Sequence, residues 1–130
     1  MKVTFLQTRE EAFMRNTIVG WILSGLLAAG FLLAGVPKLL SAPMVVQEFG
    51  LLGYPLWFMT LTGVLEVLGA ILVLIPRTAF AGALLFVCIM LGALYSHLTH
   101  GQAAMIGAPL VFLAVSLALA YVRRPSAAAA

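Results

Sequence analysis

Long runs of apolar residues alternate with short polar segments along the chain, and this pattern predicts its main elements. Four runs stand out, at residues 17–36, 54–75, 79–98 and 103–122. At a rise of 1.5 Å per residue, each forms a helix of roughly 30 Å, which is the thickness of the hydrocarbon layer of a bilayer. The pattern therefore predicts an all-α membrane protein, a four-transmembrane-helix bundle.

The polar segments mark the ends of these helices and the flanking parts of the chain. Residues 1–16 are predicted as a polar N-terminal leader, either a helix on the membrane surface or a solvated segment. Residues 37–53 are predicted as an outer loop, and residues 125–130 as a flexible tail. Pro109 lies inside the fourth run, where it cannot donate to the carbonyl of Met105, so a kink or an open acceptor is expected there.

Composition and charge support a membrane protein and exclude other classes. Of the 130 residues, 64% are apolar and 8% are charged, whereas soluble domains are nearer half apolar and a quarter charged. The seven Lys and Arg residues are scattered, so the net charge of +3 forms no basic patch and no nucleic-acid partner is expected. A single cysteine, Cys88, excludes an internal disulfide, a dithiol redox pair and a cysteine metal site.

The distribution of cations predicts the orientation in the membrane. With four spans, both termini and the second loop lie on one side, and cations concentrate on the cytoplasmic side of membrane proteins. Lys38 alone falls on the opposite side. The other six cations are Lys2, Arg9, Arg15, Arg77, Arg123 and Arg124. Both termini are therefore predicted to be cytoplasmic.

Glu66, in the second run, is the clearest candidate for function. It is predicted at a depth of about 14 to 18 Å, where an ionisable side chain costs about 2.5 to 3.5 kcal/mol. Small residues surround it at helical spacing, which predicts that Glu66 faces the bundle interior. They are Thr62, Gly63, Gly69 and Ala70. Glu66 is interpreted either as a ligand-polarising or proton-handling carboxylate, or as a protonated acid that donates one structural hydrogen bond.

Two further residues are candidates for the same site. Lys38 follows Pro37 and is interpreted either as an anchor that reaches the headgroups or as the counter-ion of Glu66. The difference in depth predicts no direct contact, so that a ligand or a water chain bridges Lys38 and Glu66. His97 ends the third run and can exchange protons with the outer compartment.

Three secondary candidates have fewer supporting features. They are His100, Tyr95 and Thr62. Two histidines three residues apart, without a neighbouring acid or cysteine, do not make a metal site, and none is expected. The aromatic residues near the ends of the runs are explained by an aromatic belt at the membrane interfaces. They are Trp21, Tyr54, Trp57, Tyr95 and Tyr121.

The order of these features resembles the DoxX-like family of small four-span bacterial membrane proteins. The segments that carry the resemblance are residues 35–39, 63–69, 75–77, 90–93 and 97–98, followed by Pro109 and residues 123–124. The resemblance implies a four-helix bundle in the bacterial cytoplasmic (inner) membrane, in which Lys38, Glu66 and His97 match the family's recurring lysine, glutamate and histidine. It also implies a possible relation to quinones, because one branch of the wider group is a membrane subunit of a thiosulfate:quinone oxidoreductase.

Three functions remain open from the sequence. The preferred hypothesis is an accessory membrane subunit that binds a quinone or similar lipophilic molecule, with Glu66 and His97 handling protons, Lys38 favouring the anionic form, and a redox protein partner handling electrons. A small proton-coupled transporter, acting as a homo-oligomer, is the second. A structural or assembly subunit is the third. With no phosphate loop, nucleophile elbow or aspartate, the isolated chain is not expected to be an enzyme.

Overall fold

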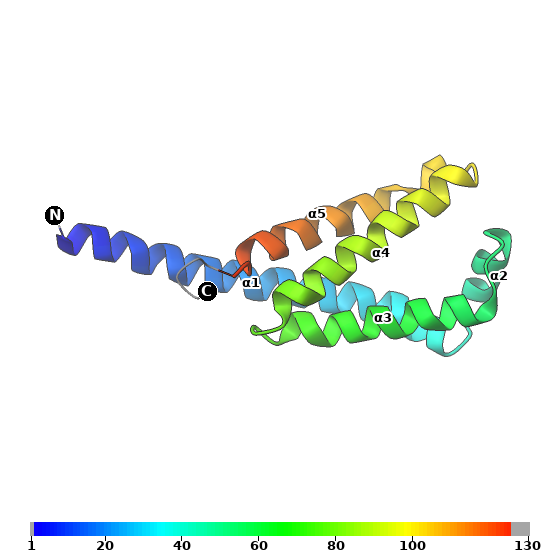
Figure 1. Cartoon of the computed structure of the whole chain (residues 1–130), viewed down its shortest axis with the longest axis horizontal. Coiled ribbons are helices and arrows are strands. Elements are labelled where there is room, and N and C mark those ends of the chain that lie inside the picture. Colours follow the sequence, from blue (N-terminus) through cyan, green and yellow to red (C-terminus); the bar gives the residue numbers. More distant parts are fainter. Residues whose placement is uncertain (1, 126–130) are drawn as a thin grey trace.

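The computed structural model describes residues 2–125, and every regular element in that part of the chain is helical (Figure 1). The elements are α1 (Lys2–Leu39), α2 (Pro43–Leu51), α3 (Leu56–Leu74), α4 (Ala79–Thr99), the short 3₁₀ helix η1 (Ala103–Met105) and α5 (Gly107–Val122). Of the tail predicted for residues 125–130, all but Pro125 lies outside the described residues.

Three helices are long and apolar enough to cross a bilayer. They are α3, α4 and the segment Thr4–Leu39 of α1. The fourth apolar helix, α5, has 16 residues and spans about 24 Å, because residues 103–105 form η1 and α5 begins only at Gly107. The prediction of an all-α membrane protein is confirmed.

Pro109 does not kink a helix, and that part of the sequence prediction is wrong. It is the third residue of α5, in the first turn, where backbone N–H groups have no partner within the helix. Proline fits such a position because its missing donor is not needed there. The chain reaches this start through Gly101, whose φ of +70° turns the backbone after α4.

Two segments contain helix: the leader, predicted to be either helical on the membrane surface or solvated, and the predicted outer loop. Residues 2–16 continue α1 in line with its apolar part, so α1 extends well beyond the other helices (Figure 1). Within residues 37–53, α1 continues through Pro37 to Leu39 and α2 begins at Pro43. Pro37 is tolerated because it lies in the last turn, where it removes one hydrogen bond and the helix ends two residues later.

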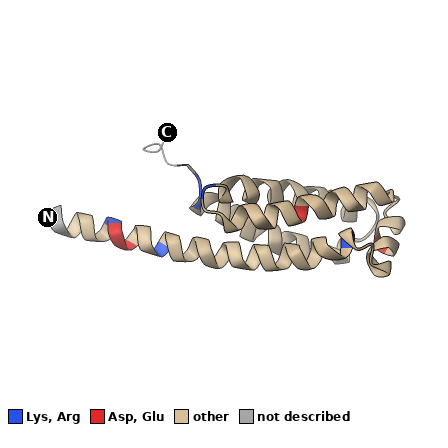
Figure 2. Cartoon of the chain, turned by 90° about the horizontal axis from the view of Figure 1, so that it is seen from below, with Lys and Arg blue, Asp and Glu red and all other residues tan. Residues whose placement is uncertain are grey.

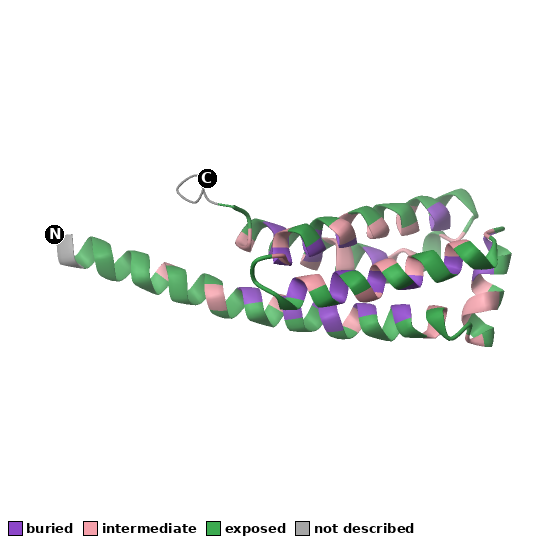
Figure 3. Cartoon of the chain, turned by 60° about the horizontal axis from the view of Figure 1, so that its bottom comes forward, coloured by how far each residue is buried: buried purple, intermediate pink, exposed green. Residues whose placement is uncertain are grey.

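The helices form two pairs, α1 with α3 and α4 with α5, which meet near the α3–α4 turn and diverge toward α2 (Figure 1). The hydrophobic core lies at the end where the pairs meet. Phe31 of α1 and Phe86 of α4 stack there with ring centroids 3.7 Å apart. Gly69 leaves room for the Phe86 ring, since any side chain atom at this position would collide with it. Exposed residues cover the outer surfaces of the helices (Figure 3), as expected for helices that face lipid.

Candidate functional site

A cavity of about 580 Å³ lies between the two helix pairs, in the half of the molecule nearest α2. Most of its wall is apolar or aromatic and comes from all five α-helices. The polar side chains in the wall belong to Lys38, Glu48, Tyr54, Thr62, Glu66, Tyr95, Ser96 and His97. This volume and this mixture of many apolar and few polar groups are typical of sites for small organic molecules.

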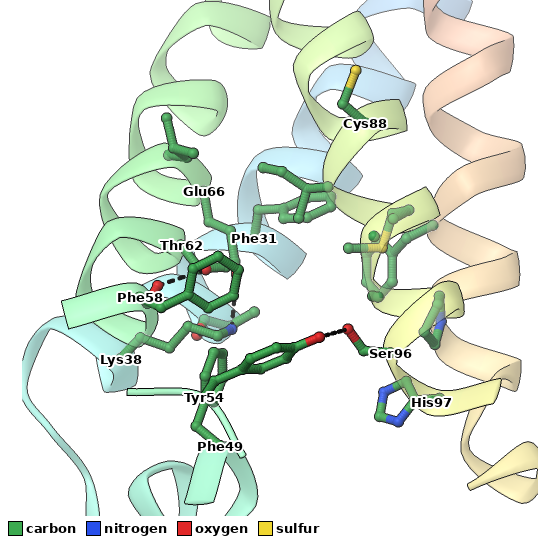
Figure 4. Close-up of a pocket in the computed structure, with 18 of the residues that line it drawn as sticks. Phe31, Lys38, Phe49, Tyr54, Phe58, Thr62, Glu66, Cys88, Ser96 and His97 are labelled. Atoms are coloured by element: carbon green, nitrogen blue, oxygen red, sulfur yellow. Dashed lines mark hydrogen bonds and ion pairs between the residues drawn. The ribbon is translucent and has the colours of Figure 1, made fainter. Parts of the chain in front are cut away.

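An ion pair between α1 and α3 forms one wall of the cavity (Figure 4). Lys38 Nζ lies 2.8 Å from Glu66 Oε1 and also donates a hydrogen bond of 3.0 Å to the carbonyl oxygen of Ala34. Glu66 is only 2% exposed. The inward orientation of Glu66 is therefore confirmed, whereas the prediction that Lys38 and Glu66 do not touch is wrong.

Two glycines explain why the lysine reaches the glutamate. A Cβ atom on Gly63 would lie 2.8 Å from Lys38 Cβ and 3.0 Å from the carbonyl oxygen of Gly35. The backbones of α1 and α3 are thus in direct contact at Gly35 and Gly63, with no side chain between them. Because α1 ends beside Gly63, about 10 Å along α3 from its first residue, Lys38 lies deeper than the beginning of α3 and only one turn from Glu66.

Within the cavity wall, the carboxylate of Glu66 neutralises the charge of the Lys38 ammonium. Glu66 Oε2, the second carboxylate oxygen, is buried and has no hydrogen-bond partner among the described residues. A buried hydrogen-bond acceptor without a partner destabilises the fold by about 1 to 3 kcal/mol. A hydrogen-bond donor next to Glu66 Oε2 would therefore be favoured.

The opposite wall of the cavity is formed by α4 and carries His97 (Figure 4). His97 is 8% exposed, and its Nδ1 lies 2.7 Å from Oε1 of Gln102. Since an amide oxygen only accepts, Nδ1 carries the hydrogen and Nε2 of the neutral ring is left as an acceptor. The structure therefore brings Lys38 and Glu66 together but places His97 across the cavity from them.

Tyr54 connects the two walls. Its hydroxyl shares a hydrogen bond of 2.6 Å with Ser96 Oγ of α4, although the residues are 42 positions apart (Figure 4). Gly53, with a φ of +76°, turns the chain immediately before Tyr54 at the junction of α2 and α3. This hydrogen bond closes part of the cavity at the end nearest α2.

The secondary candidates contribute less. The Thr62 hydroxyl lines the cavity but donates to the carbonyl of Phe58 at 2.8 Å. Tyr95 lies at the cavity wall with most of its surface exposed. His100 is exposed, lies outside the cavity lining and donates from Nδ1 to the carbonyl of Ser96 at 2.7 Å.

Comparison with known proteins places this arrangement in a family. The DoxX-like family model matches residues 22–119, a range that contains the ion pair, Tyr54 and the His97 wall. The chain belongs to the DoxX-like family. This DoxX-like chain is also 37% identical over 84 residues to the "Uncharacterized protein YdgD" of Bacillus subtilis (strain 168), an alignment that covers 62% of the chain and 74% of the relative. No solved structure matches it.

Sequence reasoning missed three polar residues of the DoxX-like site. Tyr54 was assigned to the aromatic belt, and neither Ser96 nor Gln102 was among the candidates. The order Gly53, Tyr54, Pro55 between two apolar runs was an available signal, because such a turn sets the direction of the tyrosine ring.

The Tyr54–Ser96 hydrogen bond can be tested by removing one hydroxyl. Tyr54→Phe is expected to destabilise this DoxX-like protein by about 1 kcal/mol, because Ser96 Oγ loses its partner across the cavity. The measurement is the midpoint of thermal unfolding in mild detergent. Tyr121→Phe is the matched control, since Tyr121 is 67% exposed, and equal midpoints for the two variants would show that the bond adds nothing to stability.

Proposed function

We propose that this DoxX-like chain is a multi-pass protein of the bacterial inner membrane that binds a quinone or a similar lipophilic molecule in its cavity, as an accessory subunit of a redox partner. The observation that carries the proposal is the cavity of about 580 Å³, whose apolar and aromatic wall contains one buried ion pair. A flat, apolar ring with a few oxygen atoms suits such a wall.

The proposal includes four membrane spans with both termini in the cytoplasm. The spans are the apolar part of α1 together with α3, α4 and α5. Its support is the position of the cations, which Figure 2 colours blue. Arg123 and Arg124 follow α5, which ends on the side of the bundle from which the N-terminal part of α1 extends, whereas Lys38 lies in the last turn of α1, at the opposite end (Figure 1). In this orientation the cavity occupies the outer half of the membrane.

Within the cavity, the proposed roles of the polar residues follow from their positions. Glu66 and His97 exchange protons with the oxygen atoms of the ligand, Glu66 through its unpartnered Oε2 and His97 through Nε2. Lys38 is paired with Glu66, so it orients the carboxylate and donates to the ligand rather than holding an anion. The redox partner supplies or removes the electrons.

The experiment that tests ligand binding compares proteins in which the cavity is open or filled. A Cβ atom on Gly92, a residue of the cavity wall, would have no other described atom within 4 Å, so Gly92→Trp is expected to fill the cavity without a collision at its base. Gly25→Trp is the matched control, because Gly25 also has open space and lies outside the cavity.

Each protein is purified gently from its native membrane, and the organic extract is analysed by mass spectrometry. A quinone or another single lipophilic species that is retained by wild type and Gly25→Trp, and reduced at least about tenfold in Gly92→Trp, is the expected result. Only bulk lipid in all three extracts would contradict the proposal. Proton-coupled exchange of a solute by reconstituted wild type would instead favour the transporter.

A structural role is the second candidate, and the contact of Gly35 with Gly63 favours it. This contact and the ion pair beside it fasten α1 to α3 whether or not the cavity holds a ligand. In that case Gly92→Trp would leave the extract and the assembly of partner proteins unchanged, while substitutions at Gly63 would disrupt assembly.

A further inference from the structure

The hydrogen-bonding positions left open in the cavity wall define the head group that the site accepts. The Lys38 ammonium has three N–H donors, of which one points to Glu66 Oε1 and one to the carbonyl of Ala34. The Phe49 ring centroid lies 6.0 Å from Nζ, and the described residues provide no oxygen or nitrogen acceptor for the third. Glu66 Oε2 is a buried acceptor for which those residues provide no donor. The wall thus offers one donor and one acceptor.

These two open positions belong to groups that touch each other. Because Lys38 Nζ and Glu66 Oε1 are 2.8 Å apart, the third N–H and the second carboxylate oxygen lie within reach of a single ligand atom. Both residues line the cavity, and because Glu66 Oε2 itself has almost no exposed surface, the carboxylate must turn toward the cavity to meet the ligand. The ligand group must therefore both donate and accept.

A hydroxyl group meets this requirement with one oxygen atom. Its O–H donates to Glu66 Oε2 while its lone pair accepts from Lys38 Nζ. A ketone or an ether oxygen only accepts, so it would leave Glu66 Oε2 without a partner. An ammonium group only donates and would lie against the charge of Lys38.

The charges of the wall argue against an anionic head group. Lys38 is accompanied by two carboxylates in the lining, those of Glu66 and Glu48. With one formal positive charge and two negative charges, the wall repels a carboxylate or a phosphate and admits a neutral group.

The remaining wall shows where an apolar tail can lie. Leu61 of α3 and Cys88 of α4 both line the cavity and are exposed, and so are Ala34 of α1 and Ala108 of α5. The cavity is therefore open between the two helix pairs, toward the lipid. A molecule with its head at the ion pair can extend a hydrocarbon tail through this opening.

We infer that the cavity selects a lipophilic molecule through a hydroxyl group, which donates to Glu66 and accepts from Lys38, with its apolar tail leaving between the two helix pairs. This inference rests on the proposed ligand-binding function and specifies it: of the two forms of a quinone, the reduced form, which carries hydroxyl groups, binds more tightly than the oxidised form, which carries only carbonyl oxygens.

The test uses two probes that differ by one methyl group, which replaces the hydrogen that the hydroxyl donates. 4-Dodecylphenol has a free hydroxyl, and 4-dodecylanisole is its methyl ether. Equimolar amounts are added to the full chain in lipid nanodiscs, and native mass spectrometry measures the ratio of the two bound species. Wild type is expected to bind the phenol at least about tenfold more than the ether, which corresponds to about 1.4 kcal/mol.

Two variants attribute the preference to the ion pair. Lys38→Met with Glu66→Leu removes both charges together, and the ratio is expected to fall to within about twofold while both probes still bind. Glu11→Gln, a carboxylate-to-amide change at an exposed position of α1 outside the cavity, is expected to keep the wild-type ratio. Because all proteins are compared in the same lipid, differences in partitioning of the probes cancel.

The outcomes separate the two proposals. A wild-type ratio near one, with both probes bound, overturns the hydroxyl inference and leaves the ligand-binding function standing. Failure of wild type to bind either probe, together with an extract that contains only bulk lipid, overturns the ligand-binding function itself. The decisive ratio is measured on wild type and divided by the ratio of the two probes in protein-free nanodiscs, so neither partitioning nor a folding defect of the double variant affects it.

Discussion

Glu66→Gln is expected to destabilise the folded protein by about 3 kcal/mol, because it leaves the ammonium of Lys38 in the helix interface without its counter-charge. The lysine side chain is 14% exposed, so little water can replace the lost carboxylate. The measurement is the free energy of unfolding in mixed micelles, followed by tryptophan fluorescence.

Glu48→Gln is the matched control for this substitution. It is the same chemical change in the same cavity wall, but the ion pair is left intact, and its effect is expected to stay within about 0.5 kcal/mol. Replacing both partners, as in Lys38→Met with Glu66→Leu, is expected to recover most of the lost stability. Equal losses for Glu66→Gln and Glu48→Gln would show that the ion pair does not stabilise the bundle.

Gly63→Ala is expected to cost about 2 kcal/mol and to weaken the ion pair at the same time. The added Cβ would lie 2.8 Å from Lys38 Cβ and 3.0 Å from the carbonyl oxygen of Gly35, so α1 must move away from α3. The same unfolding measurement reports the loss. The preference for 4-dodecylphenol is expected to fall as well, because the two open hydrogen-bonding positions separate.

Gly25→Ala is the matched control, because it adds the same methyl group to α1 at a position with open space around it. No other described atom lies within 4 Å of a Cβ at Gly25, so the substitution is expected to be neutral or slightly stabilising. If Gly63→Ala were as stable as Gly25→Ala, the close approach of α1 and α3 would not be a determinant of the fold.

Much of the fold could be predicted from the sequence because lipid imposes simple rules. Long apolar runs must be helical in a membrane, and small residues around Glu66 at helical spacing correctly predicted that it faces inward. The end of a helix is less certain from sequence. The first apolar run is predicted to end at residue 36, yet α1 continues to Leu39, and these few residues decide where Lys38 points.

The candidate site was predicted only in part, because its contacts depend on how the helices are offset along their axes. The Lys38–Glu66 contact requires that α1 end beside Gly63, which no local pattern reveals. The Tyr54–Ser96 bond joins residues 42 positions apart, and each looked ordinary in its own segment. Local sequence rules describe single helices, whereas these bonds depend on the packing of several.

The length of α1 has a mechanical consequence. Its 38 residues form an unbroken helix about 57 Å long, which is nearly twice the thickness of the hydrocarbon layer. Even at a steep tilt, a rigid segment must stand outside the membrane. The same helix carries Lys38 near its other end. In the proposed orientation, a rotation of α1 about its axis at the cavity therefore also rotates its N-terminal segment, on the other side of the bilayer.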